Sequence, residues 1–168
     1  MGKVILYIAT SQDGFIADIK GEVDWLPQPA GGDDFGYQAL LDQIDTIVMG
    51  SKSYLQILSF GDWAWAGKKT FIFTSQNLKT DREDIFFTSE TPQDFMKEQR
   101  DKNIWLLGGA ELAKNFSEQN LIDEYIITIV PKELGQGIKL DIDYNSFTLA
   151  NYRMLDGIVQ STYIKFIA

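Results

Sequence analysis

Two adjacent glycines, Gly108 and Gly109, stand where a strand pattern changes directly into a helix pattern. Four apolar residues from Ile104 precede them, and the helical sequence AELAKNFSEQ follows from Ala110. The first N–H groups of a helix are free and lie at the positive end of its dipole, so they bind anions, and glycine lets a bulky phosphate approach the backbone. The pair indicates either phosphate binding or a tight strand-to-helix junction. It matches neither the Rossmann fingerprint nor a P-loop.

A second junction of this kind follows the apolar strand Thr46–Gly50. The helical segment SKSYLQIL begins there, with Ser51 placed for an N-cap. Its two hydroxyl groups (Ser51, Ser53) and the ammonium group of Lys52 are groups that seek phosphate. An ordinary serine cap beside a solvated lysine is the alternative. A diphosphate ligand and coincidence explain the two glycine-led helix starts equally well.

The composition excludes several classes of site. The 168 residues carry a net charge of −9. This argues against binding to nucleic acid, because phosphate backbones require an excess of Lys and Arg on one face. The chain has no cysteine and no histidine, which excludes disulfides, thiol catalysis, His-based triads and metal sites built on Cys or His. Proton transfer must then depend on carboxylates, Tyr, Lys or water.

The N-terminal sequence MGKVILYIAT shows no targeting pattern. It has no signal-peptide cleavage site, and Leu6 stands where the myristoylation pattern needs Ser or Thr. No apolar run approaches the about 18 residues of a membrane helix. We therefore expect a cytoplasmic protein without membrane or nucleic-acid partners, and the length predicts a single domain over residues 1–168.

Strand and helix patterns alternate along the chain, with a loop over residues 24–34 and an Asp156-Gly157 hairpin turn near the end. This order predicts one α/β sheet with helices on both faces and antiparallel strands at one side. The predicted strands cover residues 4–9, 46–50, 70–75, 84–89, 104–109, 121–131, 147–156 and 158–166. The predicted helices cover residues 35–44 (capped by Asp33 or Asp34), 51–58, 91–102 and 110–119.

Four of the predicted strands end in small polar residues, in the segments IATS, IVMGSKS, FIFTS and WLLGGAE. In open α/β sheets, ligands bind at the carboxyl ends of the strands. We therefore expect these four ends to share one cleft.

Together these segments resemble the dihydrofolate reductase-like superfamily. IVMGSKSY is similar to the Met-Gly-Arg-x-Thr helix start of dihydrofolate reductases, and IWLLGGAEL is similar to their Gly-Gly junction. SQDGFIA and DEYIITIVPKELGQG are closer to the reductase domain of riboflavin biosynthesis, the C-terminal domain family with uncharacterised bacterial relatives. The matches keep their order from Tyr7 to about Leu140. The resemblance implies a three-layer α/β/α fold of the dihydrofolate reductase type, with a mixed sheet and an antiparallel C-terminal hairpin.

The resemblance also implies an oxidoreductase that uses a nicotinamide dinucleotide, usually NADPH. Ala9 would contact the nicotinamide carboxamide, and the Gly108–Gly109 peptide bond, often cis in the family, would pass under the cofactor. Thr74, Ser75 and Gln76 would line the adenosine ribose and its 2′-phosphate. The remaining cofactor contacts would come from the two helix starts, at Gly50, Ser51, Lys52, Ser53, Gly108, Gly109, Ala110 and Glu111.

The sequence departs from the family at Ser51, where the family usually has an arginine that binds the 2′-phosphate of NADPH. Lys52 can supply the charge, but without the planar fork of an arginine. NADPH is therefore the expected cofactor, NADH is an alternative, and loss of cofactor binding is a third outcome.

The resemblance places a substrate-anchoring carboxylate on the helix before the Gly50 strand. Asp34 lies at about the corresponding distance, although it or Asp33 can instead be a helix cap. Asp13 lies in the loop that enters the expected cleft, where Asp-Gly is also a common turn. Trp25 corresponds to a family tryptophan near the substrate, or packs over the sheet. Three further aromatic residues are expected to pack rather than to catalyse: Tyr54, Trp63 and Trp65.

Three functions fit this sequence. The first is hydride transfer to a small heterocyclic substrate, pterin-like or aminopyrimidine-like. The second is a 5-amino-6-(5-phosphoribosylamino)uracil reductase activity of riboflavin biosynthesis, which needs a basic pocket, whereas the three arginines (Arg82, Arg100, Arg153) lie outside the cleft-like segments. The third is a non-catalytic, nucleotide-binding relative. Exposed strand edges, together with family habit, also predict a homodimer.

Overall fold

The computed structural model describes residues 1–27 and 33–166. Part of the loop predicted over residues 24–34, namely residues 28–32, lies outside the described residues. The elements in chain order are β1 (Val4–Thr10), β2 (Phe15–Ala17), α1 (Tyr37–Gln43), β3 (Thr46–Gly50), α2 (Ser51–Leu58), β4 (Lys69–Phe73), β5 (Ile85–Thr88), α3 (Pro92–Glu98), β6 (Ile104–Gly108), α4 (Ala110–Glu118), β7 (Glu124–Ile129), β8 (Ile138–Lys139), β9 (Phe147–Leu155) and β10 (Ile158–Lys165).

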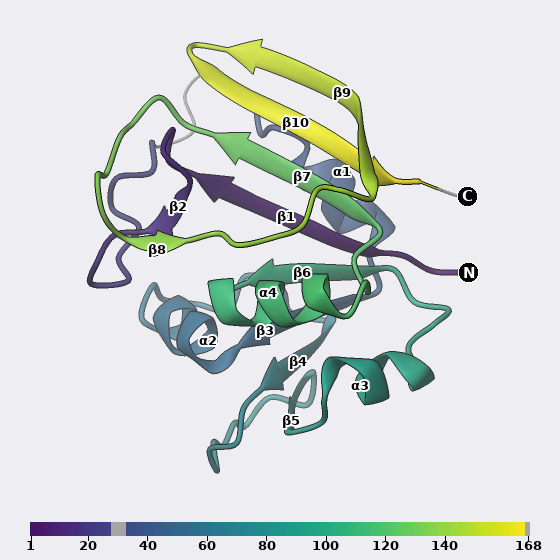
Figure 1. Cartoon of the computed structure of the whole chain (residues 1–168). Helices are drawn as coiled ribbons and strands as arrows, with labels where there is room; N and C mark the ends of the chain where they lie inside the picture. Colours follow the sequence, from purple (N-terminus) through teal and green to yellow (C-terminus); the bar gives the residue numbers. More distant parts are fainter. Residues whose placement is uncertain (28–32, 167–168) are drawn as a thin grey trace.

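An eight-stranded mixed sheet forms the centre of the fold (Figure 1). Its strand order is β5-β4-β3-β6-β1-β7-β10-β9, and the six strands from β5 to β7 are parallel. The hairpin β9–β10 adds two antiparallel strands beside β7. A separate two-stranded sheet joins β2 to β8. The predicted α/β sheet with antiparallel strands at one side is confirmed.

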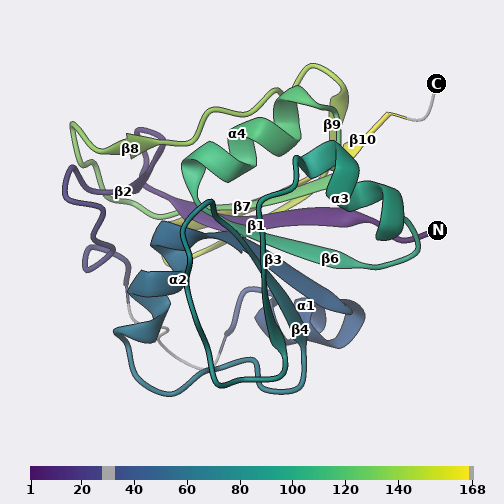
Figure 2. The ribbon, with the colours of Figure 1, turned by 90° about the horizontal axis from the view of Figure 1, so that it is seen from below.

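Helices cover both faces of the sheet, so the core has two halves (Figure 2). Alternate residues of β1 divide between them because successive side chains of a strand point to opposite faces. Leu6 packs in the half under α3 and α4, and Ile5 in the half under α1 and α2. The result is the three-layer arrangement that the resemblance implies.

The strand predicted over residues 121–131 begins later, at Glu124, because the turn that ends α4 extends to Leu121. Asn120 takes a left-handed conformation with φ 59°. Its N–H donates to the Ser117 carbonyl at 3.0 Å, and the Leu121 N–H donates to the Phe116 carbonyl at 3.0 Å. This pair of bonds is the Schellman termination of a helix, which asparagine tolerates. Residues 121–123 therefore connect this turn to β7, and Ile122 among them is buried.

The helix predicted over residues 91–102 ends at Glu98. Its start follows the prediction, because the Thr91 hydroxyl accepts the Asp94 N–H at 3.2 Å and Pro92 occupies the first turn. Beyond Gln99, the Lys102 N–H closes a turn on the Gln99 carbonyl at 3.0 Å. This turn redirects the chain into β6.

Within residues 1–27 and 33–166, no helix combines the length and the apolar character needed to cross a membrane. The cytoplasmic location stays a prediction.

Candidate functional site

The four strand ends that the sequence singles out are neighbours in the sheet. Strands β4, β3, β6 and β1 are adjacent and parallel, so their carboxyl ends lie along one edge. That edge carries Thr74 after β4, Gly50 at the end of β3, Gly108 at the end of β6 and Ala9 near the end of β1. These ends are therefore neighbours, as expected, and the cleft that they would share stays a prediction.

Helices α2 and α4 both begin at this edge with a glycine. Gly50 is the N-cap residue of α2 and Gly109 is that of α4, and within the described residues no side chain caps either helix. The Ser51 N-cap that the sequence predicted is wrong, because Gly50 already has the extended backbone of a cap and Ser51 is the first helical residue. By contrast, Thr91 caps α3. The first N–H groups of α2 and α4 are therefore left without a side-chain partner.

The two glycine starts lie against each other. A methyl group added at Gly50 would be 3.9 Å from the Gly109 nitrogen and 4.0 Å from the Gly108 carbonyl oxygen. A methyl group added at Gly109 would be 3.4 Å from the Ser53 hydroxyl oxygen. Gly108 has φ 141°, which side chains rarely adopt, and its peptide bond to Gly109 is cis, as the resemblance implies. The two helices cover opposite faces of the sheet. Because both begin at these adjoining glycines, the positive ends of their dipoles meet at this point.

The other predicted cofactor residues surround this point with hydroxyl groups and one cation. Ser51 and Ser53 are half-buried and Lys52 is exposed. Thr74 is half-buried, and its hydroxyl accepts the Gln76 N–H at 3.0 Å, which shapes the turn that also contains exposed Ser75. The first turn of α4 adds an exposed carboxylate, Glu111, so this helix offers an anion its backbone N–H groups rather than its side chain.

Asp13 fixes one loop to another. Its carboxylate accepts hydrogen bonds from the Ser11 hydroxyl at 2.6 Å, the Gly135 N–H at 2.7 Å and the Leu134 N–H at 3.1 Å. The Ser11 hydroxyl and these backbone N–H groups lower the pKa of Asp13 to about 2. An aspartate that remains ionised at neutral pH is a poor proton donor. The geometry favours a role in holding the loop after β1 to the loop before β8.

We expect Asp13→Asn to lower the melting temperature at neutral pH and to flatten its acid dependence. The folded-state pKa of Asp13 lies below the unfolded value of about 3.9, so its stabilisation is present above about pH 4 and lost as the pH falls towards 2. Thermal unfolding between about pH 7 and pH 2 measures this, with Asp62→Asn as an exposed control. Parallel pH curves for wild type and Asp13→Asn would contradict the assignment.

Asp34 is exposed and lies two residues before Gly36, which is the N-cap residue of α1. Its carboxylate accepts the Gly36 N–H at 3.1 Å and the Gln38 N–H at 2.9 Å. Neighbouring Asp33 accepts the Phe35 N–H at 2.8 Å and pairs with Arg153, and these contacts lower the pKa of Asp33. The predicted N-cap at Asp33 or Asp34 is therefore wrong, because Gly36 occupies that position. Both aspartates instead accept N–H groups of the turn before α1, and Asp34 also accepts one N–H from the first turn of the helix.

Sequence reasoning missed the contacts that hold this segment on the sheet. The Phe35 carbonyl accepts hydrogen bonds from the Tyr7 hydroxyl at 2.9 Å and from the Gln160 side-chain amide at 2.7 Å. Gln160 also donates to the Thr128 hydroxyl at 2.9 Å. Burial raises the pKa of Tyr7 to about 12, so its hydroxyl stays protonated and remains a donor. Gln160 is 125 positions from Phe35, and no local pattern signals their contact.

Arg153 lies closer to the candidate site than its sequence context indicated. Its guanidinium group stacks over the Phe35 ring, 5.0 Å from the centroid, and pairs with Asp33. It therefore reaches from β9 to the segment that leads into α1. Arg153 thus contacts the segment that leads into α1, which contains the predicted site residue Asp34.

Aromatic residues fill the half of the core under α1 and α2. Tyr54 is 3% exposed, and Trp63, Trp65 and Trp105 follow one another edge to face, with ring centroids 5.2 and 5.4 Å apart. The predicted packing role of these residues is confirmed. Trp25 is half-buried, and its indole N–H donates to the Glu22 carbonyl at 3.1 Å. The role of Trp25 at the substrate stays a prediction.

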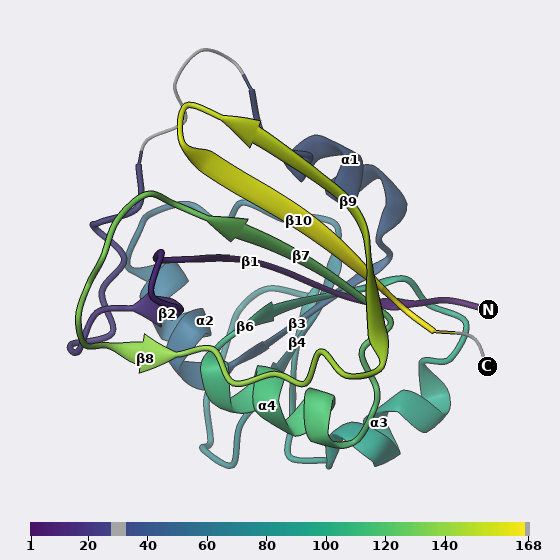
Figure 3. The same ribbon diagram turned by 45° about the horizontal axis from the view of Figure 1, so that its top comes forward.

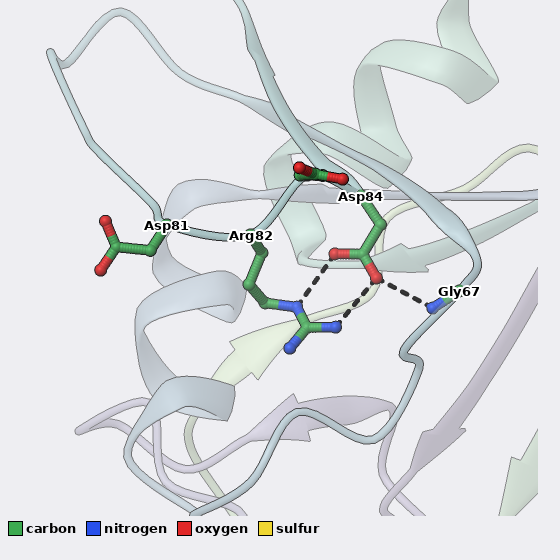
Figure 4. A pocket seen from close by; sticks show the side chains of 5 residues that line it. Gly67, Asp81, Arg82 and Asp84 are labelled. Atoms are coloured by element: carbon green, nitrogen blue, oxygen red, sulfur yellow. Dashed lines mark hydrogen bonds and ion pairs between the residues drawn. The ribbon is translucent and has the colours of Figure 1, made fainter.

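A hollow at the edge of the sheet opposite the candidate site is lined by an ion pair with a structural role. Figure 4 shows the Arg82 guanidinium forming two hydrogen bonds to the Asp84 carboxylate, each 2.9 Å long, and the Gly67 N–H donating to the same carboxylate at 2.9 Å. These residues precede β4 and β5, so they lie at the amino ends of the parallel strands. Arg82 lowers the pKa of Asp84 to about 2. Across residues 1–27 and 33–166, no cluster of acidic side chains could hold a metal ion.

Comparisons with known proteins agree with this geometry. The sequence model of the RibD C-terminal domain matches residues 65–151. The uncharacterised Bacillus subtilis (strain 168) protein YwjB is 36% identical over 142 residues, which cover 82% of each chain. A crystal structure from Shewanella sp. PV-4, of a protein named for riboflavin biosynthesis, superposes with a TM-score of 0.86 at 30% identity and covers 98% of this chain and 99% of that chain.

The fold extends to dihydrofolate reductases. Dihydrofolate reductase from Enterococcus faecalis, crystallised with NADP(H) and an inhibitor, RAB-propyl, superposes with a TM-score of 0.73 at 14% identity, covering 98% of this chain and 96% of that chain. The dihydrofolate reductase-like fold implied by the sequence is thereby confirmed. The family model and these relatives show that the chain belongs to the RibD C-terminal domain family.

Proposed function

We propose that this protein is an NAD(P)H-dependent reductase that transfers hydride to a small heterocyclic substrate, pterin-like or aminopyrimidine-like. One observation carries the proposal: the uncapped N-termini of α2 and α4 touch through Gly50, Gly108 and Gly109 at the carboxyl edge of the sheet. Two converging sets of free N–H groups suit the two phosphates of a dinucleotide. The fold and family add support, because solved relatives include a reductase crystallised with NADP(H).

The residues at this edge fit such a cofactor. The absence of side chains at the three glycines leaves the backbone open to a pyrophosphate, and Lys52 adds a positive charge. Thr74, Ser75 and Gln76 would contact the adenosine ribose, and the backbone of Ala9 would contact the carboxamide. When bound, the nicotinamide supplies the hydride. The chain's own residues orient it and exclude water.

Hydride transfer also requires a proton for the substrate, and we infer that water or a carboxyl group donates it. Asp34 stands at the start of α1, held by its bonds to the Gly36 and Gln38 N–H groups. The Phe35 carbonyl is fixed by Tyr7 and Gln160, so this turn has a defined place over the sheet. We propose that Asp34 acts there on the substrate, directly or through water, while Asp13 holds the loop after β1 to the loop before β8.

The uracil reductase activity of riboflavin biosynthesis is the second candidate, and Arg153 is the observation that favours it. Its guanidinium group lies over Phe35, beside the proposed substrate segment, and could be shared between Asp33 and a substrate phosphate. Loss of turnover with that substrate, but not with pterins, in Arg153→Met would identify this activity.

The test of the proposed function is a titration with NADPH and NADH, read by tryptophan fluorescence. Trp105 lies in β6, three residues before Gly108, and should respond to occupancy. We expect micromolar binding, followed by substrate-dependent loss of nicotinamide absorbance with dihydrofolate, pterins or aminopyrimidines. Absence of binding by both cofactors would reject the reductase function. Tight binding without turnover of any of these substrates would instead indicate a non-catalytic relative.

Lys52→Met should weaken NADPH binding about five- to tenfold and leave NADH binding within about twofold. Lys52 is the single cation among the proposed cofactor residues, and a charge-assisted bond to the 2′-phosphate at an exposed position contributes about 1 kcal/mol. The fluorescence titration measures both affinities. Lys97→Met, an exposed lysine in the last turn of α3, is the control. Equal losses for the two cofactors would show that Lys52 does not distinguish them.

A further inference from the structure

Gln160 is a buried polar residue whose side chain still has an unused hydrogen-bond acceptor. It is 8% exposed. Its amide nitrogen donates to the Phe35 carbonyl at 2.7 Å and to the Thr128 hydroxyl at 2.9 Å. Because a carbonyl oxygen can only accept, the NH₂ end of the side chain must face Phe35, and the amide oxygen must face away from it. Both N–H groups are thus engaged, and the amide oxygen is what Gln160 can offer to a ligand.

The neighbouring Thr128 hydroxyl has the opposite capacity. A hydroxyl group accepts through its lone pairs and donates its one hydrogen. Thr128 accepts from Gln160, and within residues 1–27 and 33–166 no acceptor takes its hydrogen. In the same part of the chain, no donor reaches the Gln160 amide oxygen. An unused donor and an unused acceptor therefore lie side by side, although buried polar groups are normally paired.

The space beside the Gln160 amide oxygen is open towards the start of α1. A methyl group added at Gly36 would lie 4.0 Å from this oxygen. Apart from the chain neighbours of Gly36, no other heavy atom of the described residues would lie within 4 Å of that methyl group. Gly36 itself is exposed. The amide oxygen thus faces room for a ligand rather than packed side chains.

This pair lies beside the place where the nicotinamide is proposed to bind. Ala9 of β1 stands opposite Thr128 of β7, and Thr128 stands opposite Gln160 of β10. Figures 1 and 3 show these three strands side by side. Residues that stand opposite each other share one face of a sheet, and neighbouring strands are about 5 Å apart. A ring that accepts hydride from a nicotinamide at Ala9 must lie against that nicotinamide, so Thr128 and Gln160 can contact the edge of the ring.

We propose that Gln160 is a specificity-determining residue of the reductase, and that its amide oxygen accepts a ring N–H of the substrate. The Thr128 hydroxyl donates to the adjoining carbonyl oxygen of the same ring. A lactam, in which an N–H adjoins a carbonyl group, is complementary to this acceptor and this donor together. The inference rests on the proposed function, because it places the substrate beside the nicotinamide. It narrows the substrate to small heterocycles with an unsubstituted lactam edge.

Calorimetric titration of the protein saturated with NADP⁺ tests this assignment, with pterin and 3-methylpterin as the probes. The two probes differ by the methyl group that replaces the lactam N–H. We expect micromolar binding of pterin and about 10- to 100-fold weaker binding of 3-methylpterin, because the Gln160 amide oxygen would stay buried without a donor. Gln160→Met should weaken pterin binding and bring the two affinities within about twofold of each other.

Tyr7→Phe is the matched control, because it removes the other hydrogen bond to the Phe35 carbonyl and keeps the Gln160 amide oxygen. It should retain the difference in affinity between the two probes. If Gln160 only held Phe35 in place, both variants would instead weaken both probes alike. Thr128→Val should weaken both probes about tenfold, because both retain the carbonyl group. Near-ultraviolet circular dichroism of the tryptophans checks that each variant is folded.

The outcomes separate this inference from the proposed function. Equal affinities of wild type for the two probes, or an unchanged difference in a folded Gln160→Met protein, overturn the role of Gln160. If Gln160→Met does not fold, wild-type affinity for pterin in Thr128→Val overturns it instead. A protein that binds NADP⁺ but not pterin rejects this inference alone and leaves the cofactor site standing. Absence of cofactor binding rejects both.

Discussion

Gly50→Ala should weaken NADPH binding about 30- to 100-fold while the protein remains folded. The backbone of Gly50, with φ −80° and ψ 166°, is one that alanine adopts readily. The added methyl group would lie 3.9 Å or more from the nearest atoms of the glycine junction, which is ordinary contact distance. The fold therefore has room for the methyl group. The same methyl group would, however, narrow the gap between the two helix starts, where we place the pyrophosphate.

The expected magnitude follows from the bonds that a displaced pyrophosphate would lose. Two charge-assisted bonds to backbone N–H groups, at about 1.5 kcal/mol each, correspond to about a hundredfold in affinity. Fluorescence titration measures the loss, and thermal unfolding checks the fold. Ser59→Ala at the other end of α2 is the control and should leave the affinity unchanged. Wild-type affinity in a folded Gly50→Ala protein would show that the cofactor phosphates do not lie between the helix starts.

Phe116→Ala should lower the free energy of unfolding by about 3–5 kcal/mol. Phe116 is fully buried in the half of the core under α3 and α4, and its ring meets that of Phe73 in β4 at 5.8 Å. Truncation leaves a cavity between the helix and the sheet, which a packed core fills only in part. For a chain of this length the melting temperature should fall by about 10 °C.

The same change should also affect the candidate site, because Phe116 anchors the helix that starts at Gly109. Leu112, Ala113 and Phe116 are the buried residues of α4. Denaturant unfolding measures the stability, and NADPH titration below the new melting temperature measures the effect on the site. Phe60→Ala, at an exposed phenylalanine, should change the stability by no more than about 0.5 kcal/mol. Equal effects of the two substitutions would contradict the assigned core.

The sequence predicted the sheet well because its strands are nearly continuous apolar runs. Residues of β1, β3 and β6 are buried on both faces, so their patterns admit no other element of that length. The glycine junctions were predictable for a different reason. Each places a residue without a side chain at the change from strand to helix, and parallel strands bring such changes to one edge.

Features that depend on distant residues could not be predicted. The bonds from Tyr7 and Gln160 to the Phe35 carbonyl join two strands and a loop, and the residue types alone do not show them. The exposure of β9 was also hidden, because an alternating strand sequence is typical of any half-buried strand. Its place at the sheet edge decides how much of it is covered. The N-cap of α2 was misassigned for a local reason, since serine is the commoner cap where glycine stands here.

The central position of β1 has a consequence for how the chain folds during synthesis. β1 lies between β6 and β7, with Val4 opposite Ile104 and Ile5 opposite Glu124. β1 therefore leaves the ribosome long before β6 and β7 have been synthesised, and its apolar residues remain unpaired during that time. Such distant pairings slow folding because a large loop must close before the contacts form. Chaperones that hold extended apolar segments should therefore engage nascent chains of this protein until β7 emerges.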